Sequence, residues 1–284
     1  MIRTLLAVLT VIRAAAQMSV AADYATEMME TTFKLYHPDS TATCFFVHGE
    51  VPDMRLYIVS AAHVFEGTKG DTAVVVLRQP KDDGSYERRD FTVRIRRDGK
   101  PLWAKHEKQD VAVLRVADLP PIPVPALPYS AIADENRLKT TGVHIGSPLL
   151  ILTYPQRVEA NAAGFPLTRH SIFSSPPLLP VKNYPTFMAD FTTFAGDSGG
   201  PVFMADADGH PLVVGIVLAQ NHHDEKVKSE YETLTIRHPL GLGTVLHAQY
   251  VRETLEMAAK QETPVAKNPT EPPVEKKESE KTAK

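Results

Sequence analysis

The sequence contains a single cysteine, Cys44, among 284 residues. One cysteine excludes a disulfide within the chain, so a hydrophobic core has to hold the fold together, and a composition of 43% apolar residues can supply it. We interpret Cys44 as a small buried apolar group. The alternative, a reactive thiol, needs an electropositive and partly open setting that the surrounding residues do not indicate.

The chain also lacks a strong excess of charge and any long apolar run. Its formal net charge of -3 at pH 7 carries no basic footprint of the kind that nucleic-acid binding requires, so we expect no nucleic-acid partner. No stretch reaches the roughly 20 apolar residues of a membrane-spanning helix, so we expect no membrane span. Recognition of a substrate must therefore come from local contacts.

The two ends of the chain differ in composition from the rest. Arg3, the apolar residues 5–12 and the small residues 20–22 have the order of an export signal, which predicts a signal peptide over residues 1–22 and a secreted or periplasmic protein. The alternative is an amphipathic N-terminal helix of a cytoplasmic protein. Residues 261–284 mix Lys, Glu, Pro and Thr with almost no large apolar residue, which predicts a disordered tail, with a tether to a partner as the alternative.

Between these ends the sequence has the rhythm of β structure. Residues 32–116 contain short runs of β-branched and aromatic residues, such as residues 44–47 and 72–77, separated by turn signals such as residues 82–84. This alternation is typical of antiparallel strands in a sandwich or barrel. The proline-rich residues 119–128 can neither complete a strand ladder nor continue a helix, so we interpret them as the crossing between two halves.

The second half combines further strands with one helical pattern. Apolar residues recur at spacings of three and four between residues 245 and 258, which predicts a C-terminal helix over residues 243–259. The predicted strands of this half cover residues 147–153, 186–191, 201–204, 212–218 and 232–236.

Residues 196–201 have the sequence Gly-Asp-Ser-Gly-Gly-Pro, the most specific motif in the chain. Glycines on both sides of Ser198 permit a sharp turn and the close approach of a substrate carbonyl. A serine hydroxyl is a weak nucleophile at its ordinary pKa. It therefore needs a general base, and the base needs a partner that fixes its tautomer.

Two upstream segments carry suitable residues for these roles. Residues 59–63 predict the end of an apolar strand, at His63, and Asp110 opens another predicted strand over residues 110–114. The segments Ser-Ala-Ala-His, Asp-Val-Ala-Val-Leu and Gly-Asp-Ser-Gly-Gly-Pro resemble the three active-site motifs of the trypsin-like (chymotrypsin-fold) serine peptidases of the bacterial type, in the same order along the chain. The resemblance extends over residues 32–258.

The resemblance implies an all-β fold of two six-stranded antiparallel β-barrels with a C-terminal α-helix. It divides the chain into a first barrel over residues 23–125 and a second barrel with the helix over residues 126–260. The implied function is that of a serine endopeptidase, which acts on a peptide or protein substrate and requires no cofactor and no metal.

The same resemblance assigns a role to each motif residue. His63 is the general base, Asp110 the carboxylate that orients it, and Ser198 the nucleophile. The backbone N–H groups of Gly196 and Ser198 form the oxyanion hole. Two such donors, aimed at the oxyanion that develops during attack, are worth about 3 kcal/mol or more of the barrier.

Two departures from the family pattern limit what carries over. Animal relatives are activated when a new Ile or Val N-terminus pairs with the acid before the nucleophile, here Asp197, but the N-terminal region has no Ile-Val-Gly-Gly-like segment. We therefore expect a local structural hydrogen bond for Asp197. The base of the specificity pocket falls on Thr192, so the acid that selects Arg or Lys is missing. Leu218, Ala219 and Gln220 fall on the substrate-binding strand, and the bulky Gln220 favours small or modest apolar residues at the cleavage site.

The sequence allows three other interpretations, two of the serine motif and one of a histidine pair. Gly-x-Ser-x-Gly also fits the nucleophile elbow of α/β-hydrolase esterases, but their triad runs in the order Ser, Asp or Glu, His, between parallel strands and helices. A catalytically silent peptide-binding module with a protease fold is the alternative function, because a sequence cannot show that Ser198 meets His63. A metal site at residues 222–224, His-His-Asp, lacks the ligand spacing typical of zinc.

Overall fold

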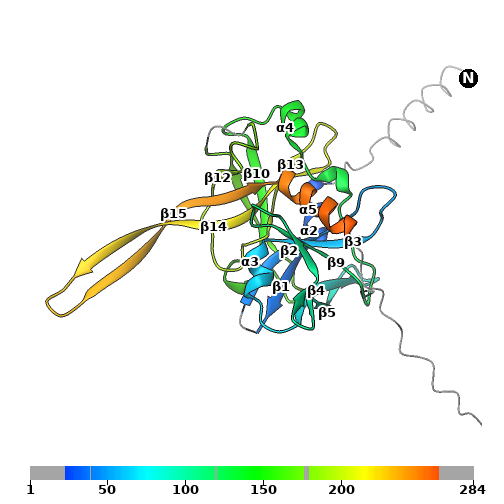
Figure 1. Cartoon of the computed structure of the whole chain (residues 1–284), viewed down its shortest axis with the longest axis horizontal. Helices are drawn as coiled ribbons and strands as arrows, with labels where there is room; N and C mark the ends of the chain where they lie inside the picture. Colours follow the sequence, from blue (N-terminus) through cyan, green and yellow to red (C-terminus); the bar gives the residue numbers. More distant parts are fainter. Residues whose placement is uncertain (1–22, 39, 119, 176–178, 262–284) are drawn as a thin grey trace, which may run out of the picture.

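The computed structural model describes residues 23–261, with gaps at residue 39, residue 119 and residues 176–178. Within these residues the chain forms two curled antiparallel β-sheets, one after the other along the sequence, and ends in a helix (Figure 1). This arrangement confirms the predicted all-β fold. The predicted signal peptide, and all of the predicted tail except Gln261, lie outside the described residues.

The first sheet contains seven strands in the order β5-β4-β1-β2-β3-β9-β8, one more than the six predicted. The additional strand is the very short β8, which pairs with β9 at one edge of the sheet. Just before β8, the N–H of Leu102 donates to the carbonyl of Ile95, just after β5 at the opposite edge, at 3.0 Å, so the sheet curls toward closure. The seven strands of this sheet are β1 (Thr32–His37), β2 (Ser40–His48), β3 (Leu56–Ser60), β4 (Thr72–Pro80), β5 (Tyr86–Arg94), β8 (Trp103–Lys105) and β9 (Ala112–Arg115). A separate two-stranded sheet consists of β6 (Arg96–Arg97) and β7 (Lys100–Pro101).

The second sheet has six strands, the number that the resemblance implied, in the order β11-β10-β13-β14-β15-β12. The five strands predicted from the apolar runs did not include β11. A bridge between Phe173 and Ala189 joins its two outer strands, so this sheet closes on itself. The division at residue 125 stays a prediction. The strands are β10 (Pro148–Thr153), β11 (Leu167–Ile172), β12 (Thr186–Asp190), β13 (Pro201–Ala205), β14 (Pro211–Lys228) and β15 (Thr233–His247).

Short helices connect and cover the sheets. The predicted start of the C-terminal helix, residue 243, was wrong. Residues 243–247 belong to β15, because Val245 pairs with Phe187 on one side and Val217 on the other. None of the described helices is long and apolar enough to cross a bilayer. They are α2 (Tyr24–Thr31), α3 (Ala62–Gly67), α4 (Glu135–Thr141) and α5 (Gln249–Lys260), with single 3-10 turns η1 (Tyr129–Ala131) and η2 (Pro155–Arg157).

The apolar core is divided between the two sheets. One cluster fills the first barrel, and Cys44 belongs to it with no exposed surface, which confirms the prediction of a small buried group. Burial also raises the pKa of the Cys44 thiol. A larger cluster fills the second barrel, continues under α5, and includes residues of the first sheet such as Phe45, Tyr57 and Val113.

A buried arginine connects these parts of the molecule. Arg78, on β4, is only 5% exposed. Its guanidinium donates to the carbonyls of Met29, Glu30 and Thr32, all at 2.9 Å, and so satisfies carbonyl groups at the end of α2. A further bond of 3.3 Å reaches the carbonyl of Gly164, in the second half of the chain.

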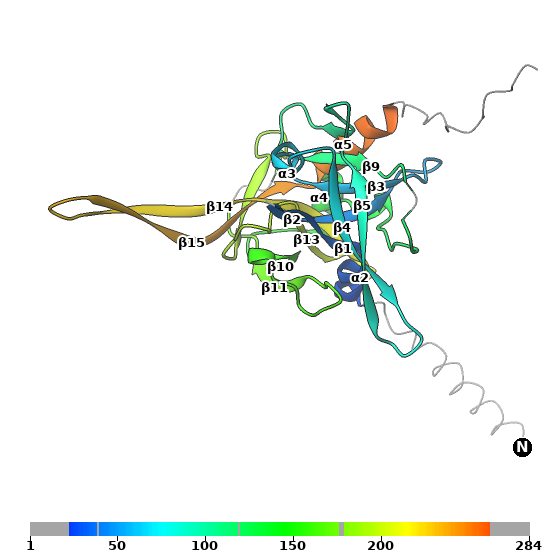
Figure 2. The same ribbon diagram turned by 90° about the horizontal axis from the view of Figure 1, so that it is seen from below.

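The hairpin of β14 and β15 extends far beyond the second barrel. We call its outer part, residues 221–240, the arm; it projects away from the rest of the molecule in both views (Figures 1 and 2). We predicted separate strands over residues 212–218 and 232–236, and the structure joins both into this hairpin. The residues that extend β14 are mainly polar and gave no apolar run from which to predict it.

Candidate active site

His63 and Asp110 are held together by two hydrogen bonds. His63 is the second residue of α3, which starts directly after β3, so it lies on a helix and not at the end of a strand as predicted. Asp110 lies in the loop before β9. Its Oδ2 is 2.6 Å from Nδ1 of His63, and its Oδ1 accepts the backbone N–H of His63 at 2.9 Å. Because one carboxylate binds both groups, the imidazole is fixed with Nε2 left for proton transfer.

The carboxyl group of Asp110 is ionised in this setting. Burial acts to raise its pKa, but the hydrogen bonds from the side chain and backbone of His63 outweigh burial and lower the pKa below its usual value. The side chains of His63 and Asp110 are 46% and 37% exposed, so the pair is open to a ligand.

Ser198 lies on a turn whose shape requires glycine. Gly196 has a φ of +102°, and a Cβ there would overlap the carbonyl oxygen of Tyr154. Gly199 has a φ of +82°, and a Cβ there would overlap the Ser60 hydroxyl, at the end of β3 just before α3. The two glycines therefore let the turn approach both a neighbouring loop and the strand that leads to His63.

Thr43, on β2, fastens this turn to the first barrel. Its N–H donates to the carbonyl of Ser198 at 3.0 Å, and its hydroxyl donates to the carbonyl of Gly196 at 2.8 Å. The same hydroxyl accepts the N–H of Tyr154 at 3.2 Å, and the Thr43 carbonyl accepts the Ser60 hydroxyl at 2.8 Å. Thr43 is fully buried. The turn of Ser198, in the second barrel, is thus bonded to the strands that precede His63.

The Ser198 hydroxyl itself donates to the carbonyl of Leu218, on β14, at 3.2 Å. Within the described residues no hydrogen bond joins Ser198 to His63. The structure therefore brings His63 and Asp110 into direct contact and places Ser198 at the same seam between the barrels. The described residues do not show the hydrogen bond between Ser198 and His63 that would connect all three side chains.

Two backbone donors on the turn have no hydrogen-bond partner among the described residues. In the described part of the chain, the N–H groups of Gly196 and Ser198 donate no hydrogen bond, whereas those of Asp197 and Gly199 donate to backbone carbonyls at 3.1 and 2.8 Å. Buried backbone N–H groups are nearly always paired, so two unpaired donors within one turn are a feature that a ligand can use.

Asp197 makes an ion pair that the sequence did not indicate. The expected local bond is present, since Oδ2 accepts the N–H of Phe194 at 2.8 Å, but the same oxygen lies 2.7 Å from Nη2 of Arg169 on β11. Arg169 also donates to the carbonyl of Thr192 at 2.7 Å and to the hydroxyl of Thr153 at 2.6 Å. Arg169 lies between polar residues in the sequence, a pattern that does not distinguish it from a residue exposed to solvent.

The residues predicted to bind substrate lie on β14 and just after β12. Leu218 lies at a bulge of β14 beside Ser198, and Ala219 and Gln220 follow it on the same strand. Thr192 lies just beyond β12 and is bound through its carbonyl by Arg169. Their roles in specificity stay predictions.

The residues weighed as a metal site lie on the arm. Nε2 of His222 is 3.6 Å from Oδ1 of Asp224, and His223 pairs across the hairpin with His238. The part of the chain that the structure describes contains no group of three or more potential metal ligands.

Two curled antiparallel sheets, with a glycine-lined serine turn at the seam between them, define a chymotrypsin-like fold. The family profile described as "Trypsin-like peptidase domain" matches residues 42–216. The match covers more than half of the sequence, so the chain belongs to the trypsin-like peptidase domain family.

The chain is similar to the crystal structure of Rv3671c from M. tuberculosis H37Rv, in the inactive form of a serine-to-alanine mutant, with a TM-score of 0.48 and 17% sequence identity over 87% of this chain and 96% of that one. No curated protein matches the sequence.

The Arg169–Asp197 pair should contribute strongly to stability. Replacing Arg169 by methionine leaves a buried carboxylate, 1% exposed, without its counter-charge, and we expect a loss of roughly 3–5 kcal/mol in the free energy of unfolding, measured by denaturant titration. Arg137→Met is the matched control, because the Arg137 side chain is 46% exposed in its pair with Asp206, and its loss should be about 1 kcal/mol or less. Equal losses in the two variants would contradict the importance of the Asp197 pair.

Proposed function

We propose that this chain is a serine endopeptidase, exported to the periplasm or the cell exterior. Ser198 attacks the carbonyl carbon of a peptide bond while His63 takes its proton, and His63 then returns the proton to the leaving amine. Water activated by the same imidazole hydrolyses the acyl-enzyme. The observation that carries the proposal is the bonded His63–Asp110 pair, placed at the seam to which Thr43 fastens the turn of Ser198.

The unpaired amides of Gly196 and Ser198 support the same reaction. Attack on a carbonyl carbon turns its oxygen into an oxyanion, and two donors that are already in place stabilise it without reorganisation. Family membership and the absence of other partners for these N–H groups in the described residues both agree with this role. A side chain larger than glycine at Gly196 would collide with Tyr154 and displace the first donor.

Before attack, the Ser198 hydroxyl has to leave the carbonyl of Leu218. A substrate that pairs as a strand with β14 brings its own backbone N–H groups to this edge, and one of them can take the Leu218 carbonyl as its acceptor. The hydroxyl is then released to bond to Nε2 of His63. In this mechanism substrate binding itself aligns the nucleophile with its base.

One observation favours a second function. Because the Ser198 hydroxyl is bonded to Leu218 and not to His63, a catalytically silent peptide-binding module would have the same geometry. The chemistry of Ser198 decides between the two functions.

We predict that a fluorophosphonate probe labels the purified wild type and that peptide mapping finds the label on Ser198. The Ser198→Ala variant should remain unlabelled while its circular dichroism matches the wild type, because only the nucleophile has been removed. A folded wild type that does not react would instead favour the silent module.

A second prediction concerns Asp110. Asp110→Asn should fold, but its rate of labelling and peptide hydrolysis should fall roughly a thousandfold or more, since an amide at this position favours the wrong tautomer of His63. The pKa of Asp110 is lowered, so the wild-type carboxylate is charged throughout the neutral range and the defect should be present across it. Asp206→Asn, which removes an acid paired with Arg137 elsewhere, is the control and should react at the wild-type rate. Near-normal turnover by Asp110→Asn would show that Asp110 does not have the assigned role.

A further inference from the structure

The arm continues the strand that lies beside Ser198. β13 pairs with β14 only as far as Ile216, and Gly199 and Gly200 extend that pairing to Val217. Farther along β14, over residues 218–228, no described strand pairs with the edge that faces away from β15. The free edge therefore begins at the residue whose carbonyl holds the Ser198 hydroxyl.

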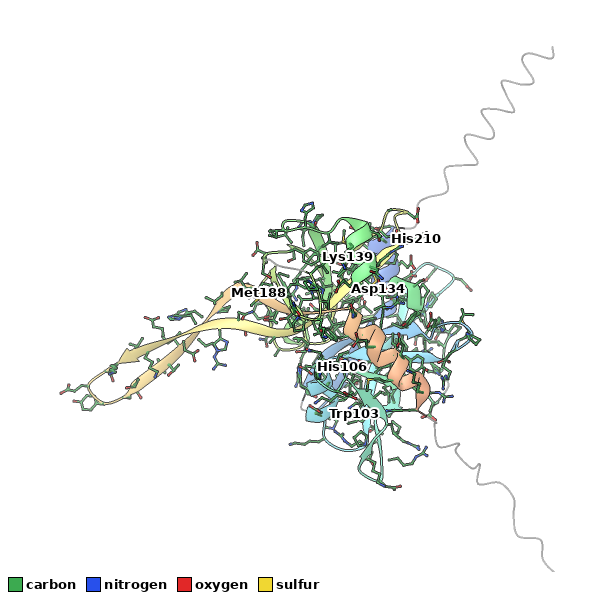
Figure 3. The ribbon with its side chains drawn as sticks, turned by 45° about the horizontal axis from the view of Figure 1, so that its top comes forward. Trp103, His106, Asp134, Lys139, Met188 and His210 are labelled. Carbon is green, nitrogen blue, oxygen red and sulfur yellow. The ribbon has the colours of Figure 1, made fainter. Side chains whose placement is uncertain are left out.

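The position of the arm agrees with this continuity. In both views the helix that carries His63, α3, lies near the point where β14 leaves the barrel (Figures 1 and 2). Met188 marks the base of the arm (Figure 3), where its sulfur lies 3.5 Å from Nδ2 of Asn221. Beyond this base the arm has the other strand of its own hairpin as its partner.

Exposed apolar side chains gather on one face of the outer arm. Val227 and Leu234 are paired across the hairpin and so share this face, which Ile236 joins two residues farther along; these side chains are 43%, 56% and 37% exposed. The same face becomes polar toward the base of the arm, where Oε2 of Glu225 lies 2.8 Å from Nε2 of His238. The opposite face carries Asp224, bonded to Arg237 at 3.2 Å. A free strand edge with exposed apolar residues is a combination that proteins normally cover, and an isolated two-stranded hairpin is only marginally stable in water.

We propose that the arm is an extended substrate-binding edge, along which an unfolded segment of a protein substrate pairs as an added strand. This inference rests on the proposed function. Both sheets are antiparallel throughout, so the added strand runs antiparallel to β14. With the scissile carbonyl at Ser198, the substrate residues that reach the arm are those on the N-terminal side of the cleaved bond.

The length and chemistry of the arm define the substrate class. Residues 218–228 offer room for roughly eight to ten paired substrate residues at about 3.4 Å per residue. Apolar substrate side chains at alternate positions would cover Val227 and Leu234. Such a substrate is a long extended segment, as found in unfolded proteins or flexible termini, and not a compact loop.

Cleavage of peptides of different length tests the proposal. A fluorogenic peptide with a fixed cleavage sequence is extended by up to ten residues on its N-terminal side, or on its C-terminal side as the control. In the full chain we expect kcat/KM to rise roughly tenfold or more with N-terminal extension, mainly through KM, because each added residue pair contributes further strand hydrogen bonds. A gain confined to C-terminal extension, or no gain, would overturn the proposal.

Variants of the arm test whether the gain in kcat/KM depends on it. Replacing residues 224–237 by Asn-Gly joins His223 and His238, which already pair, through a tight hairpin turn and should abolish the gain from N-terminal extension. Val227→Ser with Leu234→Ser keeps the length of the arm and should reduce the gain, while Lys226→Ser with Arg237→Ser on the opposite face is the matched control. An unchanged gain in the shortened variant would overturn the proposal.

The strand pairing itself is tested with uncleaved peptides. Single backbone N-methyl groups are moved along the N-terminal extension, and binding to the Ser198→Ala variant is measured by fluorescence anisotropy. Strand pairing predicts that every second methyl group weakens binding, since alternate N–H groups face β14. A smooth profile would contradict pairing. A lower oligomeric mass of the shortened arm in sedimentation, with unchanged peptide binding, would identify the arm as a contact between copies and overturn the proposal.

These measurements separate the two levels of inference. Fluorophosphonate labelling reports the chemistry of Ser198 without the arm, so its failure counts against the endopeptidase alone. Anisotropy with the alanine variant reports the arm without chemistry, and its failure counts against the binding edge alone.

Discussion

Hydrogen bonds from Thr43 join the turn of Ser198 to the first barrel, and the geometry of the candidate site depends on them. The Thr43 hydroxyl reaches the carbonyl of Gly196, 153 residues away, while its N–H reaches the carbonyl of Ser198. Both carbonyls are thereby turned toward the first barrel, and within the described residues the N–H groups of Gly196 and Ser198 are left for a ligand. A chain with a single cysteine thus joins its two barrels beside the candidate site through one buried threonine and the glycines that let the turn approach it.

Two carboxylates beside this seam have opposite environments and opposite uses. Asp197 is fully buried and held by Arg169, so its charge serves to anchor the turn. Asp110 is partly open to solvent and bonded to both the ring and the backbone of His63, so in the proposed reaction its charge is available to an imidazolium. The counter-charge of Asp197 thus comes from Arg169 on β11, a residue of the same barrel.

The sequence was sufficient where short-range sterics determine the structure. The glycines around Ser198 predicted a sharp turn there. Short apolar runs between turn signals predicted the all-β fold. Long-range partners were not predictable: Arg169 looks like a surface residue and Thr43 like one polar residue in an apolar strand. The start of α5 was placed too early because Val245 fits a helical spacing, but pairing with two strands takes precedence. The polar arm has no apolar periodicity that would reveal it.

The most direct test of the seam is the rate of fluorophosphonate labelling in Thr43→Val, compared with Thr43→Ser. Valine keeps the shape of threonine but leaves the carbonyl of Gly196 and the N–H of Tyr154 without a partner, whereas serine keeps the hydroxyl. We predict that the valine variant folds, loses about 1–3 kcal/mol of stability and labels at least roughly tenfold more slowly, while the serine variant stays close to the wild type. A folded valine variant that labels at the wild-type rate would contradict the central role of Thr43.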